Sequence, residues 1–240
     1  MAEPGCAVCH CATQAEDRFF QAALYERVVE VPFRERLRET GGFCARHAQA
    51  LLAYRDPLAT AILYGDLLRQ RRELLARWRG TRLPLGARRP AWARADGAAW
   101  GRRCMACAIT AEAERRACAV LATGLGQGRL AEAWAASAGL CWPHFAMARP
   151  LCGVAARRLL DDVEAQRLQA LGADVQALID SFDYRSDGQR PPQVESAWRR
   201  VVAALAGRGF GPGEGGGAGA AERRRRLPPR AGARPGGARG

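Results

Sequence analysis

The sequence predicts an all-α protein made of two pseudo-repeated helical units and a disordered C-terminal tail. Apolar residues recur at three- and four-residue spacing along most of the chain, and no segment has a convincing strand pattern. A CxxC followed by a CxxH occurs twice, with 34 residues between the two motifs in the first copy (10–43) and 33 in the second (108–140). From residue 211 onward Gly, Pro and Arg dominate, and such a composition cannot bury a core.

The first unit, residues 1–79, is expected to contain four helices, with its CxxC in a loop before them. Two glycines end the second helix, as Gly just past a helix should. An Asp-Pro pair starts the fourth helix, with Asp as N-cap and Pro at the first helical position. The fourth helix has apolar residues on two sides, which predicts that it packs between neighbours. The four expected helices lie near residues 13–28, 33–39, 47–52 and 57–78.

The second unit, residues 102–210, repeats this plan and adds C-terminal helices. Three glycines between positions 124 and 128 are expected to divide the span from CxxC to CxxH into two helices. A long helix with one apolar face should follow His144, and a short last helix should carry Trp198. A basic linker interrupted by Gly and Pro, residues 80–101, joins the two units, and residues 211–240 form the Arg/Gly-rich tail.

The net charge of +13 comes from Arg alone, because the chain contains no Lys. Arg, Ala and Gly all have GC-rich codons, so this bias indicates a GC-rich genome more than a nucleic-acid reader. Non-specific polyanion binding through Arg223–Arg226 in the tail is still an expectation. No run reaches the roughly 18 apolar residues of a membrane helix, and the N-terminus lacks a secretory pattern. A cytoplasmic protein without a membrane segment is therefore expected.

Nine cysteines and three histidines carry the distinctive chemistry of this chain. In a reducing compartment, cysteines at CxxC spacing are more often metal ligands or redox pairs than disulfides. A CxxC in a tight turn and a CxxH at a helix start each place two donor atoms on one side. Two such motifs can complete a tetrahedron of three sulfurs and one nitrogen, a Cys3His quartet. The candidate metal ligands are Cys6, Cys9, Cys44, His47, Cys104, Cys107, Cys141 and His144.

Zinc is the expected ion at both quartets, because separated CxxC and CxxH motifs are typical of zinc sites. An iron–sulfur cluster is the alternative, since three cysteines and one histidine can also hold one. Four protein ligands leave no open position for substrate, which is typical of structural zinc, and no nucleophile–base pair is evident, so catalysis is disfavoured. The sequence leaves open whether each quartet closes within its own repeat or exchanges ligands with the other.

Further residues near the motifs admit two interpretations. Glu16 and Glu114, at matched positions, either orient the ligand histidines or are ordinary charges near a helix start, and the second interpretation is favoured. Other cysteines and one histidine have no matching partner; they can offer spare ligands, but core filling or simple exposure is favoured. This group consists of Cys11, Cys118, Cys152 and His10.

The duplicated CxxC…GFCxxH frame, together with the closing stretches 182–185 (FDYR) and 196–200 (SAWRR), resembles a family of uncharacterised bacterial proteins known as a domain of unknown function. The resemblance covers about residues 4–206, and all eight motif residues are present in this chain. It supports the predicted fold and implies no activity.

The leading hypothesis is a cytoplasmic, two-site metal-binding helical scaffold that acts by binding a protein partner. The first alternative is an iron–sulfur protein that senses redox or metal status. The second is a nucleic-acid-associated factor that uses the basic linker and tail.

Overall fold

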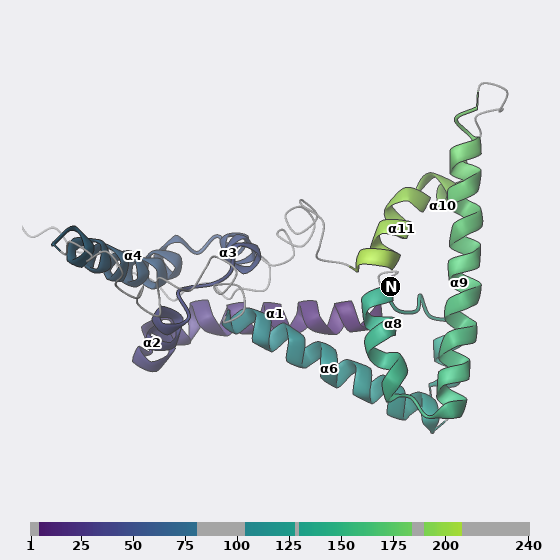
Figure 1. Cartoon of the computed structure of the whole chain (residues 1–240), viewed down its shortest axis with the longest axis horizontal. Coiled ribbons are helices and arrows are strands. Elements are labelled where there is room, and N and C mark those ends of the chain that lie inside the picture. The colour runs from purple at the N-terminus through teal and green to yellow at the C-terminus, as the bar shows by residue number, and fades with distance from the viewer. Residues whose placement is uncertain (1–4, 81–103, 128–129, 184–189, 208–240) are drawn as a thin grey trace, which may run out of the picture.

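The computed structural model describes residues 5–80, 104–127, 130–183 and 190–207 (Figure 1). Every regular element in these ranges is helical and no strand occurs there, which confirms the all-α prediction. Most of the expected linker and all of the Arg/Gly-rich tail lie outside the described residues. The elements are α1 (Ala7–Tyr25), η1 (Arg27–Val29), α2 (Val31–Glu39), α3 (Ala45–Leu52), α4 (Pro57–Gly80), α6 (Met105–Gly126), α7 (Ala131–Ala135), α8 (Trp142–Ala148), η2 (Arg149–Leu151), α9 (Val154–Asp180), α10 (Pro192–Glu195) and α11 (Ala197–Ala206), where η marks a 3-10 helix.

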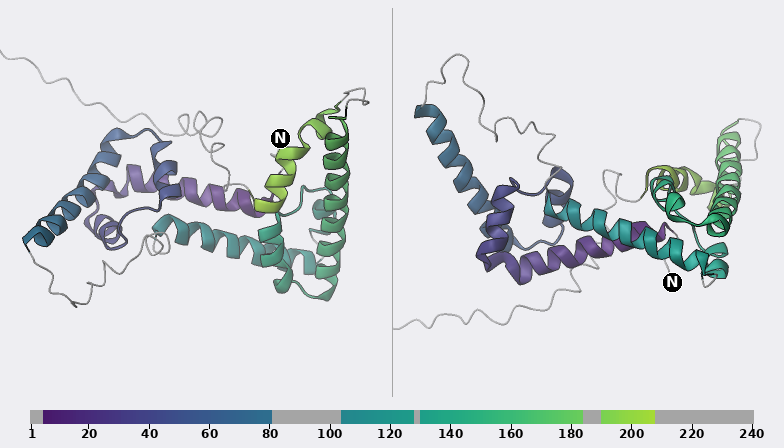
Figure 2. Two further views of the ribbon diagram at one scale, coloured as in Figure 1. Left: turned by 45° about the horizontal axis from the view of Figure 1, so that its top comes forward. Right: turned by 60° about the horizontal axis from the view of Figure 1, so that its bottom comes forward.

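Helices α1 and α6 form the central pair of the molecule and run antiparallel to each other (Figures 1 and 2). Helix α1 begins beside α8, among the helices of the second unit, and ends at α2 (Figure 1). Helix α6 begins near α3, in the first unit, and runs toward α7 and α9 (Figure 2). The start of each of these two helices, where the CxxC lies, is therefore placed in the opposite unit.

Two apolar cores lie at the two ends of this pair, and each takes residues from both units. The core built on α6, α8 and α9 also contains Val8 and Cys9 from the first unit. The core built on α1 to α4 also contains Cys104 and Ala106 from the second unit. Burial of these side chains is worth about 25 cal/mol per Å² of apolar surface, so apolar packing already favours the crossed arrangement.

The first helix begins earlier than expected. Helix α1 starts at Ala7 with Cys6 at its N-cap, so the CxxC forms the first helical turn and the loop prediction for it is wrong. Residues 6–25 contain neither Gly nor Pro, so nothing in this stretch prevents the helix from beginning at the CxxC. The predicted division of the second span is confirmed, because α6 ends at Gly126 and α7 follows as a separate helix.

Helix α4 contacts α2, α1 and η1, as the prediction that it packs between neighbours requires, but much of its outer side is exposed. Leu63 and Leu67 are buried, and the helix contacts α2. Leu58, Leu68 and Leu75, which lie on the other apolar side of the helix, are all more than half exposed. The far end of the helix projects away from the central pair (Figure 1), whereas Ile62 nearer its start packs against the core.

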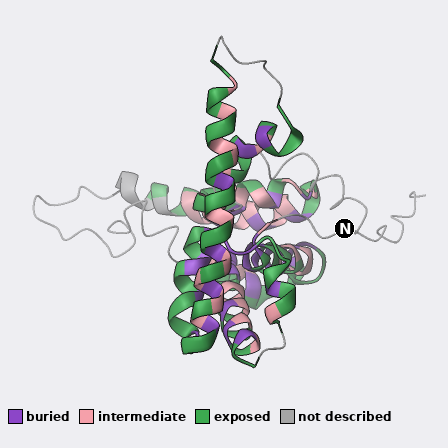
Figure 3. Ribbon diagram, turned by 90° about the vertical axis from the view of Figure 1, so that its right-hand side faces the viewer, coloured by how far each residue is buried: buried purple, intermediate pink, exposed green. Residues whose placement is uncertain are grey.

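The long helix expected after His144 is α9, which begins after the short helices α8 and η2. Its burial is concentrated in its first half, where Leu160 and Glu164 are buried, and Leu171 is the last buried residue (Figure 3). Helices α10 and α11 then fold back against α9 and bring the end of α11 to α8 (Figure 1). This return places the end of the described chain next to one of the Cys/His groups.

Candidate metal centres

All four Cys/His motifs occupy the same position, the first turn of a helix. In each motif the first cysteine is the N-cap residue, and the second ligand is the third residue of the helix. N-cap and third helical residue lie on the same side of the turn, so their side chains point to a common centre. The unpaired N–H groups and positive end of a helix favour thiolate there. The N-cap residues are Cys6, Cys44, Cys104 and Cys141.

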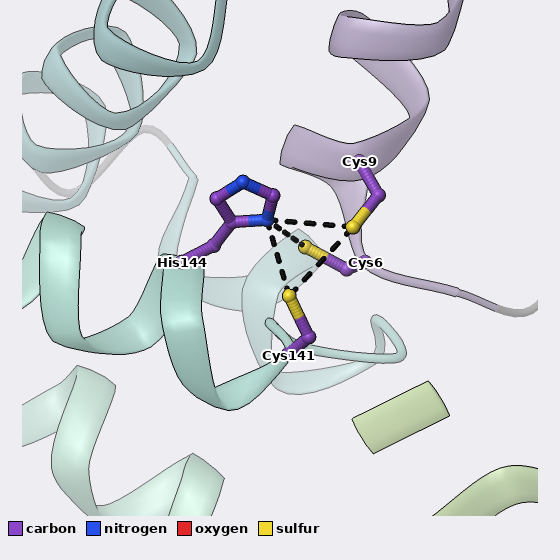
Figure 4. Close-up of side chains that lie close together, drawn as sticks. All are labelled: Cys6, Cys9, Cys141 and His144. Carbon is purple, nitrogen blue, oxygen red and sulfur yellow. Dashed lines mark hydrogen bonds between the residues drawn. The ribbon is translucent and has the colours of Figure 1, made fainter. Parts of the chain in front are cut away.

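Site 1 consists of Cys6 and Cys9 from the start of α1 and Cys141 and His144 from the start of α8 (Figure 4). Nδ1 of His144 lies 3.4 Å from Sγ of Cys6, 3.4 Å from Sγ of Cys9 and 3.1 Å from Sγ of Cys141. The Sγ atoms of Cys9 and Cys141 are 3.6 Å apart. All four residues are buried.

Site 2 consists of Cys44 and His47 from the start of α3 and Cys104 and Cys107 from the start of α6. Nδ1 of His47 lies 3.1 Å from Sγ of Cys44, 3.5 Å from Sγ of Cys104 and 3.2 Å from Sγ of Cys107. The Sγ atoms of Cys44 and Cys107 are 3.6 Å apart. His47 and Cys104 are buried, whereas Cys44 and Cys107 are partly exposed.

Both sites have the dimensions of a single tetrahedral ion. Bond lengths of about 2.3 Å to sulfur and about 2.0 Å to nitrogen give tetrahedral edges of about 3.8 Å between sulfurs and about 3.5 Å between sulfur and nitrogen. The sulfur–sulfur contacts given above are 3.6 Å, and the sulfur–nitrogen contacts range from 3.1 to 3.5 Å. Within each group the four donor atoms lie within 4.8 Å of one another. Each group can therefore hold a metal ion with protein ligands alone.

The two sites exchange ligands between the repeats, which settles the alternative that the sequence left open. All eight predicted ligands are brought together, and each site joins the CxxC of one unit to the CxxH of the other. Helix length explains this exchange. The 19 residues of α1 carry the chain about 28 Å from the first CxxC, and the 9 residues of α2 return at most about half of that distance. The 22 residues of α6 and 5 residues of α7 repeat this imbalance in the second unit.

The side chains of site 2 influence one another's pKa. Burial lowers the pKa of His47, but the interactions with the Cys104 thiolate and the nearby Glu16 carboxylate outweigh burial and raise it to about 10. Burial raises the pKa of Cys104, but the hydrogen bond with His47 outweighs it and lowers this pKa to about 6. Burial raises the pKa of Cys107 to about 12. Without metal, the arrangement thus favours an imidazolium–thiolate pair, and a bound cation would displace the protons of His47 and Cys107.

Site 1 has the same chemistry in a more buried setting. Hydrogen bonds from Cys141 and Cys9 hold the pKa of Cys6 far below its usual range, and the pKa of Cys141 is raised correspondingly. Burial lowers the pKa of His144, but hydrogen bonds with Cys6, Cys9 and Glu114 outweigh it and raise this pKa to about 12. The negative charge is thus placed on the sulfur of Cys6. A bound divalent cation would neutralise this charge and would replace the proton on the imidazolium of His144.

The structure places both matched glutamates beside the candidate ligand histidines, against the interpretation favoured from sequence. Oε2 of Glu16 lies 3.7 Å from Nε2 of His47 in site 2. Oε1 of Glu114 lies 3.5 Å from Nε2 of His144 in site 1. In both histidines Nδ1 faces the sulfurs, so the carboxylates approach the nitrogen that is not directed at the metal position.

The other cysteines and His10 do not belong to either group. Cys118 and Cys152 are buried in the core around site 1, where burial raises the pKa of Cys118 to about 11. Cys11 is exposed, and His10 is exposed with its Nε2 2.8 Å from Nε2 of Gln14. These positions agree with core filling and surface exposure, the interpretation that the sequence favoured.

One residue at site 1 was missed by the sequence analysis. Gly207 follows α11 with φ of +79°, and a Cβ placed there would lie 3.2 Å from Sγ of Cys141 and 3.6 Å from Sγ of Cys9. The end of α11 therefore covers two of the sulfurs, and a side chain at this position would crowd them. A Gly after a run of helix-forming residues is a recognisable helix end, but its contact with the site depends on how α11 folds back.

Gly139, in the turn before the second CxxH, is expected to be essential for the shape of that turn. Its φ is +75°, and a Cβ there would overlap Nη1 of Arg167 and lie 2.8 Å from Oε2 of Glu164. Gly139→Ala should lower the free energy of unfolding by about 2 kcal/mol, measured by urea denaturation. Gly172→Ala is the control, because Gly172 lies within α9 with no heavy atom within 4 Å of its added Cβ, and there Ala should stabilise by up to about 1 kcal/mol. Equal effects of the two substitutions would contradict this account of the turn.

Within the part of the chain that the structure describes, no helix combines the length and apolarity needed to cross a membrane.

Comparisons with known proteins give a family without an assigned activity. One similar protein is described as an "Uncharacterized 23.9 kDa protein in xynA 3'region" of Caldicellulosiruptor sp. (strain Rt8B.4). It is 48% identical over 67 residues, which cover 28% of this chain and only 32% of that protein. No solved structure matches the chain. The family described as "Family of unknown function (DUF6062)" matches residues 1–210, and the chain therefore belongs to this family.

Proposed function

We propose that this protein is a metal-locked helical scaffold that holds one zinc ion in each site and acts by binding a protein partner. The observation that carries the proposal is the ligand exchange, because each ion would join a CxxC of one unit to a CxxH of the other. A structural zinc ion contributes about 10–16 kcal/mol of apparent binding free energy, which becomes folding free energy when the site forms only in the folded state. The two ions would thus hold α1 and α6 in the opposite units.

The donor geometry supports zinc over the iron–sulfur alternative. A cluster places several iron atoms between its ligands, so the donor atoms must stand farther apart than the edges of a single-ion tetrahedron. The contacts of 3.1 to 3.6 Å between donor atoms fit one ion. Three thiolates and one imidazole nitrogen at such distances are a common zinc ligand set.

A binding role is favoured over catalysis for two reasons. Each site has four protein donors, so a tetrahedral ion would have no position for water or substrate. Site 1 is also covered by the end of α11, where Gly207 approaches two sulfurs. An ion that is enclosed in this way stabilises the folded conformation, and a fixed conformation presents a constant surface to a binding partner.

Metal analysis of the purified full-length chain tests this proposal. We expect about two equivalents of zinc per chain, no visible colour and no acid-labile sulfide. Replacement by Co²⁺ should give the intense visible bands of tetrahedral cobalt and the near-ultraviolet absorption of thiolate–cobalt charge transfer. A brown protein with iron and labile sulfide would overturn the zinc assignment.

The binding role is tested with the same preparation. Proteins retained by the zinc-loaded chain should be lost when a chelator has removed the metal, and the interaction should then be rebuilt from purified components and measured by calorimetry. A partner that binds the metal-free chain with the same affinity would contradict the idea that the ions maintain the binding shape.

A further inference from the structure

The positions of Glu16 and Glu114 relate the two sites to each other. Each glutamate lies ten residues after the first cysteine of its own CxxC, on the same helix. Helix α1 therefore provides two cysteines to site 1 and, two turns farther on, the carboxylate next to His47 of site 2. Helix α6 provides two cysteines to site 2 and the carboxylate next to His144 of site 1.

We propose that Glu16 and Glu114 are positioning residues that orient His47 and His144 through their Nε2–H groups, and that they thereby couple the two metal sites through α1 and α6. This inference rests on the proposed metal binding. It assigns a role to two carboxylates that are not themselves among the eight ligands.

The chemistry of histidine explains why a carboxylate is needed. A metal bound at Nδ1 leaves the ring proton on Nε2, which then must donate a hydrogen bond. Nε2 of His47 is buried and has no hydrogen-bond partner within the usual distance among the described residues, and such an orphaned donor is costly. Glu16 supplies an acceptor at 3.7 Å, so a movement of about 0.5–1 Å closes the hydrogen bond.

The surroundings of the two carboxylates predict that Glu16 holds its histidine more firmly than Glu114 does. Its side chain is only 11% exposed, and Nη2 of Arg46 lies 3.1 Å from the same Oε2 atom that faces His47. The side chain of Glu114 is 29% exposed. Because water can replace a more exposed carboxylate, a substitution of Glu16 should affect its site more than a substitution of Glu114.

The coupling follows from the stiffness of a helix. Seven residues separate Cys9 from Glu16, which corresponds to about 10 Å of helix axis. An ion in site 1 would fix the first turn of α1, and this would bring Glu16 into place next to His47. The same relation holds along α6 from Cys107 to Glu114, in the opposite direction. Filling one site should therefore raise the affinity of the other.

The test uses the full-length zinc protein with three single substitutions, Glu16→Gln, Glu114→Gln and Glu112→Gln. Glu112 is the matched control, because it lies on α6, is half exposed and pairs with Arg115 and Arg116 rather than with a histidine. Zinc affinity is measured by competition with a chromophoric chelator. We expect Glu16→Gln to weaken site 2 by about 10–100-fold, Glu114→Gln to weaken site 1 by less, and Glu112→Gln to change neither.

NMR spectroscopy of the ¹⁵N-labelled histidines separates positioning from general destabilisation. In the zinc-loaded parent, the Nε2–H protons of His47 and His144 should resonate downfield and exchange slowly. Glu16→Gln should shift and broaden only the His47 signal, while both Nδ1 atoms still show metal coordination. Loss of helicity in a variant would affect both histidines together and is recognised by circular dichroism.

Coupling is measured as a change in the zinc affinity of the site whose histidine the substituted glutamate does not face. Glu16→Gln should also lower the zinc affinity of site 1, by a smaller factor. Loss of the ion from site 2 would release the first turn of α6, and Glu114, farther along the same helix, would then be held less firmly next to His144. Unchanged affinity and unchanged His47 signals in Glu16→Gln would overturn the positioning role, whereas a loss confined to site 2 would overturn the coupling alone. A parent chain that binds no zinc would instead overturn the proposed function.

Discussion

Cys141→Ser is expected to release the ion of site 1 and to cause a large loss of stability. Cys141 is the N-cap of α8, and its Sγ contacts both Cys9 and His144. Because structural zinc contributes about 10–16 kcal/mol, a defective site should lower the midpoint of thermal unfolding by more than about 10 °C. Metal analysis should give about one equivalent of zinc, and circular dichroism should report the unfolding midpoint.

Two other Cys→Ser substitutions accompany this one, the first at site 2 and the second at a cysteine outside both sites. Cys44→Ser should remove the ion of site 2 in the same way, since Cys44 is the N-cap of α3 and contacts His47. Cys11→Ser should leave both ions and the midpoint unchanged, because Cys11 is exposed and belongs to neither group. Two equivalents of zinc and an unchanged midpoint in Cys141→Ser would exclude Cys141 as a ligand.

A chain divided into residues 1–90 and 91–240 is expected to assemble much more tightly when metal is present than through the apolar contacts of α1 and α6 alone. Each site takes two ligands from each fragment, so both ions would join the fragments. The co-expressed fragments should purify together with about two equivalents of zinc, and treatment with a chelator should strongly weaken their association. Analytical ultracentrifugation measures this directly, because the pair and the single fragments differ in mass.

The single fragments provide the decisive control. Residues 1–90 contain Cys6, Cys9, Cys44 and His47, but α1 places about 28 Å of helix between the two motifs. This fragment alone should therefore bind zinc much more weakly than the assembled pair. If each fragment by itself bound one ion as tightly as the pair does, the ligand exchange would be wrong as the native arrangement.

Much of the local structure could be predicted from the sequence. Gly41 and Gly42, both with positive φ, end α2 as expected, and Pro57 begins α4 as expected. These features depend on residues that are adjacent in the chain, where backbone sterics decide the outcome. Interactions that depend on distant residues were predicted less well. Helix α4 has two apolar stripes, but which of them is covered depends on where α2 lies.

The glutamates illustrate the same limit. Their equal spacing from the two CxxC motifs was visible in the sequence, but the same spacing also suits ordinary charges on a helix. What distinguishes a positioning carboxylate from an ordinary helix charge is whether a histidine from another helix lies opposite it. Gly207 is a similar case, since the sequence marks it as a helix end and only the return of α11 to α8 brings it to the sulfurs.

The sequence by itself determined the helical class and the eight candidate metal ligands. Thiolates and imidazoles at C-x-x-C and C-x-x-H spacing converge within one helical turn, so local geometry is sufficient to identify all eight residues. The tertiary structure alone decided which motifs meet. Helices α1 and α6 are too long for either repeat to close on itself, and their antiparallel packing brings each CxxC to the CxxH of the other unit.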